Sequence, residues 1–274
     1  MYGLWGYKAN KNDLREKMKG LEFFKKYVSL SVPKKIIITY FLCWAGFLFS
    51  FSIGKLLLYF SSIFKSKVIT EPAKVAQTVG TAKFKAVSSA VSTTVGAKNA
   101  YLTYSLSYII SNFLGCLIII SALGALAYLY KKDMENAKTP EEKEEIIANY
   151  QKYLFILFIF TVINPLTGLI GVNLDYHDLV AVIPHGTFEF MGFAISVVAG
   201  VELANKIFPI VKKSLTYKKL ALLVLASFIF ISIAGFLEPI DWYIFEYARI
   251  NNYPLTYAFI TAYKHLILYL ISHI

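Results

Sequence analysis

The sequence predicts an all-α membrane protein that crosses the bilayer with about six helices. Hydrophobic residues make up 57% of the 274 residues and charged residues only 16%. The charges fall between apolar runs rather than inside them. Each main run is close to or above the roughly 20 residues that a helix needs to cross about 30 Å of hydrocarbon. We therefore expect a single helical membrane domain over residues 35–274.

Six apolar stretches define the expected spans. They cover about 36–60, 101–130, 154–172, 179–203, 220–238 and 255–272. The last one carries Lys264 and His265 at its middle, so three alternatives stay open for it: a sixth span, an interfacial helix or a buried C-terminal helix. The count falls to five if this run is interfacial.

A basic segment, residues 1–34, precedes the first span. Its apolar residues recur at helical spacing among lysines: Leu14, Met18, Leu21, Phe24 and Val28. This pattern predicts an amphipathic helix on the inner membrane surface or, equally well, a cytoplasmic extension packed on the bundle. Nine lysines and arginines precede the first apolar run, so the positive-inside rule places the N-terminus in the cytoplasm. The segment is too long to be the start of a cleavable signal peptide.

Two polar segments separate the early spans. Residues 61–100 are expected to form an external amphipathic insert, which begins a helix near Thr70-Glu71-Pro72; a solvated loop is the alternative. Residues 131–153 form the expected cytoplasmic helical loop, in which Thr139-Pro140-Glu141-Glu142 is typical of a helix N-terminus. The predicted location is the cell membrane, with several spans and both termini inside. The net charge of +11 is explained by this topology and by anionic lipid, and no basic soluble domain indicates nucleic-acid binding.

The candidate functional centre is the motif that runs from Pro184, His185 and Gly186 to Glu189. Ionisable groups inside a membrane are costly and usually face a protein interior or a wet cavity. On a helix His185 and Glu189 lie one turn apart on the same face. Three further polar residues in the spans are expected to converge on the pair: Asn112, Asn164 and Glu238. Because Asn164 precedes a proline, as Ile183 does, we expect a kinked or broken pair of helices around the motif.

Small residues recur at every fourth position in two spans. They are Gly46, Ser50 and Gly54 in the first span, and Gly192, Ser196 and Gly200 after the motif. Such stripes let helix backbones approach closely in lipid. The second stripe continues back through Glu189 and His185, so the polar pair is expected to face other helices.

Three hypotheses compete for His185 and Glu189. They form a hydrogen-bonded network with Asn112, Asn164 or the broken backbone; they bind a metal such as zinc; or Glu189 carries a proton or cation for transport. A metal site needs a third ligand, with the candidates His177, Asp175, Asp178 and Glu238. The chain lacks the His-Glu-x-x-His motif of zinc peptidases, and no inverted repeat indicates a secondary transporter.

The motif, with its apolar helix ending at Gly200, resembles the signature of the stage II sporulation protein M family of integral membrane proteins. The resemblance extends to the preceding Asn-Pro and Gly-rich span, to Asn112 and to the late span that ends at Glu238, and so covers roughly residues 36–238. It implies a membrane scaffold that holds cell-envelope proteins in place in spore-forming bacteria. Many members occur in organisms that do not sporulate, so what it implies here is an integral membrane fold with a polar motif.

From the residues and the resemblance together we expect a membrane scaffold or assembly protein that organises partner proteins. Its expected partners are the lipid bilayer, further copies of itself and other membrane or cell-envelope proteins. No nucleophile-base pair, phosphate loop or cofactor fingerprint indicates an enzyme, and no cofactor other than the zinc of the metal hypothesis is expected. The alternatives are a metal-dependent intramembrane enzyme, such as a peptidase, and an ion-coupled transporter that uses His185 and Glu189.

Overall fold

The computed structural model describes residues 22–64, 70–95, 100–163, 174–212 and 214–272, and this part of the chain is helical without strands. After a short helix over residues 22–29, the elements follow in one series. They are α2 (Val32–Phe64), α3 (Glu71–Val95), α4 (Ala100–Asn136), α5 (Pro140–Ile163), the 3-10 helix η3 (His177–Val182), α7 (Ile183–Ile207), α8 (Tyr217–Ile250) and α9 (Leu255–Ser272). The predicted all-α class is confirmed.

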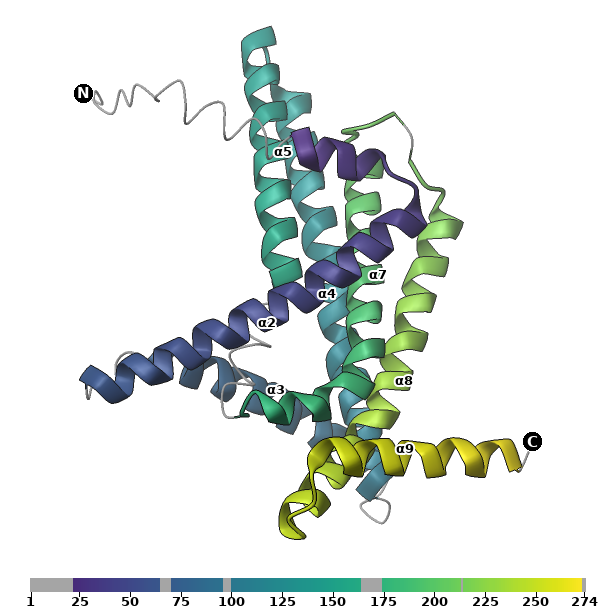
Figure 1. Ribbon diagram of the computed structural model, residues 1–274. Coiled ribbons are helices and arrows are strands. Elements are labelled where there is room, and N and C mark those ends of the chain that lie inside the picture. The colour runs from purple at the N-terminus through teal and green to yellow at the C-terminus, as the bar shows by residue number, and fades with distance from the viewer. Residues whose placement is uncertain (1–21, 65–69, 96–99, 164–173, 213, 273–274) are drawn as a thin grey trace.

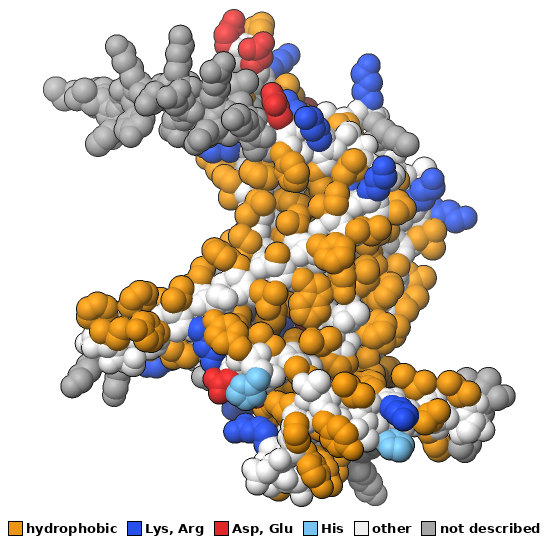
Figure 2. All heavy atoms as spheres, viewed as in Figure 1, with side chains coloured by type: hydrophobic (Ala, Val, Ile, Leu, Met, Phe, Trp, Pro, Cys, Tyr) orange, Lys and Arg blue, Asp and Glu red, His pale blue; other side chains and the backbone are white. Residues whose placement is uncertain are grey.

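Five helices of the described chain are long and apolar enough to cross a membrane: α2, α4, α5, η3 with α7, and α8. In Figure 1 α4, α5, α7 and α8 run side by side, and α2 crosses them obliquely so that its C-terminal end projects away from the bundle. Figure 2 shows an apolar belt around the middle of this face, with lysines and arginines gathered towards the ends. The polytopic helical membrane fold is therefore confirmed.

Helix α7 is the centre of the bundle. In its most apolar window of 18 residues 72% are buried, against 22% to 33% in the other four candidate spans. Its small residues bring neighbours close: a Cβ added at Gly192 would lie 2.7 Å from the Ile231 side chain of α8, and one at Gly200 would lie 2.6 Å from Leu123 of α4. Between them, Ser196 and Ser227 join their hydroxyls at 2.7 Å.

The first small-residue stripe holds α2 against α5. A Cβ at Gly46 would lie 2.6 Å from the Cα of Ile163, so only glycine permits this crossing. Ser50 and Gly54 of the same stripe are also buried, and the Ser50 hydroxyl donates to the Phe47 carbonyl of its own helix.

The C-terminal run departs from the six-span expectation, because α9 is not among the five candidate spans. Figure 1 shows that α9 lies across the end of α8 instead of running beside it. The polar groups Lys264 and His265 at its middle are both exposed, which is consistent with the interfacial alternative. We call this end of the bundle, which also carries α3 and η3, the distal end.

The fifth span was expected to end at residue 238, but the helix found there is longer. Helix α8 continues through Pro239 to Ile250, because a proline inside a helix removes one donor and bends the helix without having to end it. The consequence for the site is large, since Asp241 now lies on a helix next to the motif.

The expected loop 131–153 consists of the ends of α4 and α5, joined by residues 137–139. The helix start predicted there is confirmed: Glu142 N–H donates to the Thr139 hydroxyl at 3.1 Å, and Thr139 N–H donates to the Glu142 carboxylate at 3.2 Å. This reciprocal pair is a capping box.

The insert 61–100 contains one helix, α3, whose start at Glu71 agrees with the prediction. It packs against α4, where Phe84 contacts Tyr108 with ring centroids 4.7 Å apart. The solvated-loop alternative is therefore wrong for residues 71–95.

The described part of the basic N-terminal segment packs on the bundle. Phe24, Tyr27 and Val28 are 0 to 2% exposed, and the Phe24 ring lies 5.4 Å from that of Phe158 on α5. Of the predicted amphipathic face, Leu14, Met18 and Leu21 lie outside the described residues. Packing on the bundle, one of the two alternatives, is thus what the residues from 22 onwards show.

The N-terminal segment and the connection between α4 and α5, both predicted to be cytoplasmic, lie at the same end of the bundle, whereas the C-terminal helix α9 lies at the opposite end, so the expectation that both termini share one side is wrong. The N-terminal helix, the connection between α4 and α5, and the connection between α7 and α8 are all at the upper end in Figure 1. This end is opposite the distal end, which carries the polar motif.

Candidate functional site

The motif opens helix α7 at the distal end. Pro184 occupies the first turn, where its missing N–H group is not needed. The N-cap residue Val182 provides no side-chain cap. The cap comes from another helix: the carboxylate of Asp241 on α8 accepts the backbone N–H of His185 at 3.0 Å. A negative charge in this position also complements the positive end of the helix dipole.

The same carboxylate binds the His185 ring. His185 Nδ1 lies 2.7 Å from Asp241 Oδ2, and the two side chains are 5% and 0% exposed. The other carboxylate oxygen, Oδ1, accepts the hydroxyl of Tyr263 from α9. Burial and this hydrogen bond raise the pKa of the Tyr263 hydroxyl, which keeps it protonated as a donor. Asp241 therefore joins α7, α8 and α9; we call these three residues the His–Asp–Tyr clamp.

Two further carboxylates, Glu189 of α7 and Glu238 of α8, lie beside the clamp. Both residues are half-buried, and the two charges interact with each other and with His185. The indole of Trp242 lies against Glu238. We call Glu189 and Glu238 the carboxylate pair.

A lysine of α3 interacts with one member of the carboxylate pair. Lys83 interacts electrostatically with Glu189, and its ammonium group lies 3.9 Å from where a Cβ would stand at Gly115 of α4. Burial lowers the pKa of Lys83, and the negative charge of Glu189 opposes that shift.

The other predicted site residues contribute in different ways. Gly186 allows α2 to approach, since a Cβ there would lie 3.3 Å from the Trp44 ring. Asn112 is half-buried on α4, and no hydrogen bond between described residues joins it to His185 or Glu189. Asn164 lies outside the described residues, as do the proline and glycines that follow it, so the broken span they predict is not described. His185 does make a buried hydrogen bond, but its partner is Asp241, which was not among the expected partners. The expected network of Glu189 with Asn112 or Asn164 stays a prediction.

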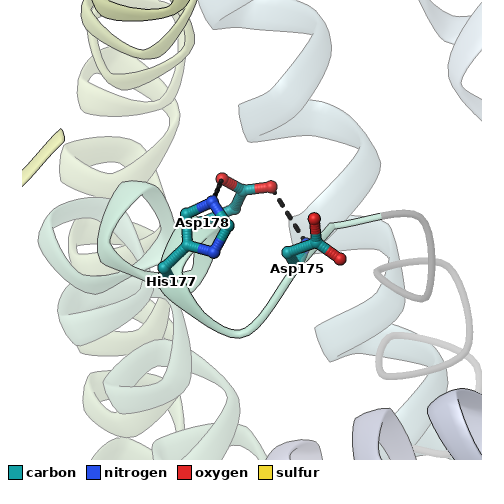
Figure 3. A group of neighbouring side chains, drawn as sticks. All are labelled: Asp175, His177 and Asp178. Atoms are coloured by element: carbon teal, nitrogen blue, oxygen red, sulfur yellow. Dashed lines mark hydrogen bonds and ion pairs between the residues drawn. The ribbon is translucent and has the colours of Figure 1, made fainter. Parts of the chain in front are cut away.

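The three other candidate metal ligands form a separate group on the surface. In Figure 3 Asp175 lies just before η3, and His177 and Asp178 are its first two residues. His177 Nε2 lies 3.2 Å from Asp178 Oδ1, and the Asp175 N–H donates to Asp178 Oδ2 at 2.9 Å. Their ligand atoms lie within 4.8 Å of one another. Lys55 of α2 already places its ammonium group 3.4 Å from Asp175. The described residues do not bring this group to His185 and Glu189, and metal binding by that pair stays a prediction.

Sequence reasoning missed Asp241, Tyr263 and Lys83. Asp241 lies beyond residue 238, where the fifth span was expected to end, although an acidic residue three positions after Glu238 in an apolar stretch is a signal that was present. Lys83 lies far from the motif along the chain, and nothing in its own segment indicates where the side chain points.

The chain that carries the clamp and the carboxylate pair is similar to a known archaeal protein. It is 72% identical over 255 residues to uncharacterized protein MJ0096 of Methanocaldococcus jannaschii, a match that covers 93% of this chain and 97% of the relative. The chain belongs to this archaeal protein's family. No family model matches the chain, and no solved structure matches it. The resemblance to the stage II sporulation protein M family therefore stays an expectation based on the motif.

Proposed function

We propose that this protein is an integral membrane scaffold or assembly protein, which holds partner chains through the apolar surfaces of its outer helices. The observation that carries the proposal is the set of contacts that the motif's histidine, His185, makes with other helices. Asp241 occupies both the backbone N–H and the ring Nδ1 of His185 and also receives Tyr263. The motif's histidine therefore serves helix packing, which is the role expected of a structural network.

The shape of the molecule supports a role in assembly. The C-terminal part of α2 projects from the bundle (Figure 1), and large apolar side chains there are exposed: Leu56, Leu58, Tyr59, Phe60, Ile63 and Phe64. A span that leaves the bundle offers a transmembrane surface that a partner helix can cover, and van der Waals packing drives such association in lipid. We call residues 56–64 the α2 arm.

Photo-crosslinking in native membranes tests this proposal. A photoreactive residue at Phe60 in the α2 arm is expected to give discrete protein adducts, either with a second copy or with another membrane protein. The matched control is Leu225 of α8, an exposed apolar residue within the bundle's own span, which is expected to give lipid adducts. Lipid adducts alone at both positions would contradict a scaffold that works through the α2 arm.

A further inference from the structure

We propose that a groove between α8 and α9 binds one anionic lipid of the surrounding bilayer, with the lipid's chain lying in the groove and its phosphate at Lys264 of α9. The groove has a volume of about 350 Å³, which lies within the range of small-molecule pockets. We call it the tyrosine groove after four of the side chains that line it: Tyr243, Tyr247, Tyr253 and Tyr257. This site is independent of the scaffold role, because it lies at the distal end and does not use the α2 arm.

The turn after α8 creates the groove. Asn252 has a φ of 56°, the left-handed conformation that asparagine tolerates better than most residues, and the Tyr253 N–H donates to the Ala248 carbonyl at 2.9 Å. The chain changes direction here, so that α9 lies across the end of α8 (Figure 1). The Tyr263 hydroxyl of α9 donates to Asp241 of α8. The clamp therefore holds α9 in position, and the groove is formed before any ligand binds.

The lining of the groove is aromatic and apolar. The Tyr243 and Tyr247 rings are stacked with centroids 6.4 Å apart, and the Tyr247 and Tyr253 centroids are 6.1 Å apart, so the three rings form one continuous wall. The α9 side contains Ala258 and Ala262, whose small side chains leave room between the helices. A lining of rings and methyl groups fits a hydrocarbon chain, because burying the chain there removes apolar surface from water.

The groove is continuous with the lipid-facing surface of α8. Large apolar side chains recur on this helix at intervals of four or seven residues, and all of them are exposed: Leu225, Ile229, Phe236, Tyr243 and Tyr247. The helical period of 3.6 residues places them in one stripe, which runs from the candidate span into the tyrosine groove. A chain of a bilayer lipid that covers this stripe therefore reaches the groove along an unbroken apolar surface.

The depth of the groove matches the headgroup layer of the bilayer. Lys218 and Lys219 precede Leu220 at the start of α8, so we take Leu220 as the first residue in the hydrocarbon. Tyr243 follows Leu220 by 23 positions, which is about 35 Å at a rise of 1.5 Å per residue, whereas the hydrocarbon core is about 30 Å thick. The groove thus lies just beyond the core, where amphipathic tyrosine rings are favoured.

The charge beside the groove is positive. Helix α9 carries Lys264 and no acidic residue. Lys264 is exposed and follows the lining residue Thr261 by three positions, which makes the two side chains neighbours on the helix. The exposed charges of α8 at this level, Glu246 and Arg249, are opposite in sign, so Lys264 sets the balance. An ammonium group at headgroup depth attracts an anionic lipid.

The test is a lipid titration of the delipidated full chain in detergent, followed by native mass spectrometry, which counts the lipids bound to each protein molecule. The probes are phosphatidylglycerol, which is anionic, and phosphatidylcholine, which is zwitterionic, with identical chains. Wild type is expected to bind one phosphatidylglycerol about fivefold more tightly than phosphatidylcholine, because one lysine near the membrane surface contributes about that factor.

Two pairs of variants separate the two halves of the site. Thr261→Phe fills the groove and is expected to lose the bound lipid, whereas Ile260→Phe, at an exposed position of α9 outside the lining, is expected to keep it. Lys264→Gln is expected to bind both lipids equally, whereas Lys218→Gln, at the other end of α8, is expected to keep the preference for phosphatidylglycerol.

Three results would overturn the proposal. They are equal affinity of wild type for the two lipids, an unchanged preference in Lys264→Gln, and undiminished lipid binding by a folded Thr261→Phe protein. If Thr261→Phe does not fold, the comparison of Lys264→Gln with Lys218→Gln decides. A wild-type dimer that binds no lipid and dissociates in Thr261→Phe would also overturn the proposal and assign the groove to a second copy.

Discussion

Replacing Asp241 by alanine is expected to destabilise the helical bundle by about 3 to 5 kcal/mol. The side chain is fully buried and receives three hydrogen bonds, two from His185 and one from Tyr263. Breaking a buried charge pair by removing one partner costs about 3 to 5 kcal/mol in soluble proteins. Three interhelical hydrogen bonds at the roughly 0.6 to 1.7 kcal/mol measured in membranes give about 2 to 5 kcal/mol, so both routes lead to the same range.

The assay is reversible unfolding in bicelles or mixed micelles, followed by helix content. A double-mutant cycle of Asp241→Ala with His185→Ala isolates the pair and is expected to give a coupling free energy of about 1 to 3 kcal/mol. Tyr263→Phe removes a single donor and is expected to cost about 0.5 to 1.5 kcal/mol.

The control is Glu246→Ala, which removes an exposed carboxylate from the same helix and is expected to change the free energy of unfolding by less than about 0.5 kcal/mol. A clamp role for Asp241 would be refuted if Asp241→Ala behaved like this control, or if the cycle gave a coupling energy near zero.

Three further changes test the packing of the bundle by the same unfolding assay. Gly46→Ala is expected to lower the free energy of unfolding by about 1 to 3 kcal/mol, because the added Cβ would lie 2.6 Å from the α5 backbone. Gly115→Ala is the near-neutral control, because its Cβ would meet nothing nearer than 3.7 Å. Equal losses in the two variants would contradict the α2–α5 crossing. Lys35→Met leaves Glu202 buried without its partner and is expected to cost about 3 to 5 kcal/mol, much of it recovered when Glu202→Gln is added; additive losses would argue against the pair. Phe24→Ala is expected to cost about 3 to 5 kcal/mol, because the ring is 0% exposed; no loss would mean that the N-terminal helix does not pack on the bundle.

The apolar runs predicted most of the fold, because a segment in lipid must hydrogen-bond its backbone N–H and C=O groups internally. A helix is the only structure that does this within a single segment. Hydropathy therefore placed α2, α4, α5, α7 and α8 without any knowledge of contacts. It failed where local rules compete. Pro239 interrupts a helix in most contexts, yet α8 continues past it to Ile250. The run of α9 is long enough to span but carries Lys264 and His265 at its middle.

The candidate site was half predicted. The cost of burying charge identified His185, Glu189 and Glu238, since such groups stand out in an apolar sequence. Their partners depend on how helices cross, which a period of 3.6 residues does not specify. Asp241 became a partner of His185 because α8 continues past Pro239, and Lys83 interacts with Glu189 because α3 packs against α4. Both facts belong to the packing and not to any local pattern.

Native mass spectrometry of particles excised directly from the membrane by a polymer measures the assembly that a scaffold must form. The chain has a mass of 31.0 kDa. We expect particles heavier than one chain with its lipids, containing a second copy or another membrane protein, and we expect Phe60→Ser in the α2 arm to shift them towards the single chain. Particles that contain one chain and lipid alone, in wild type and variant alike, would contradict the scaffold function.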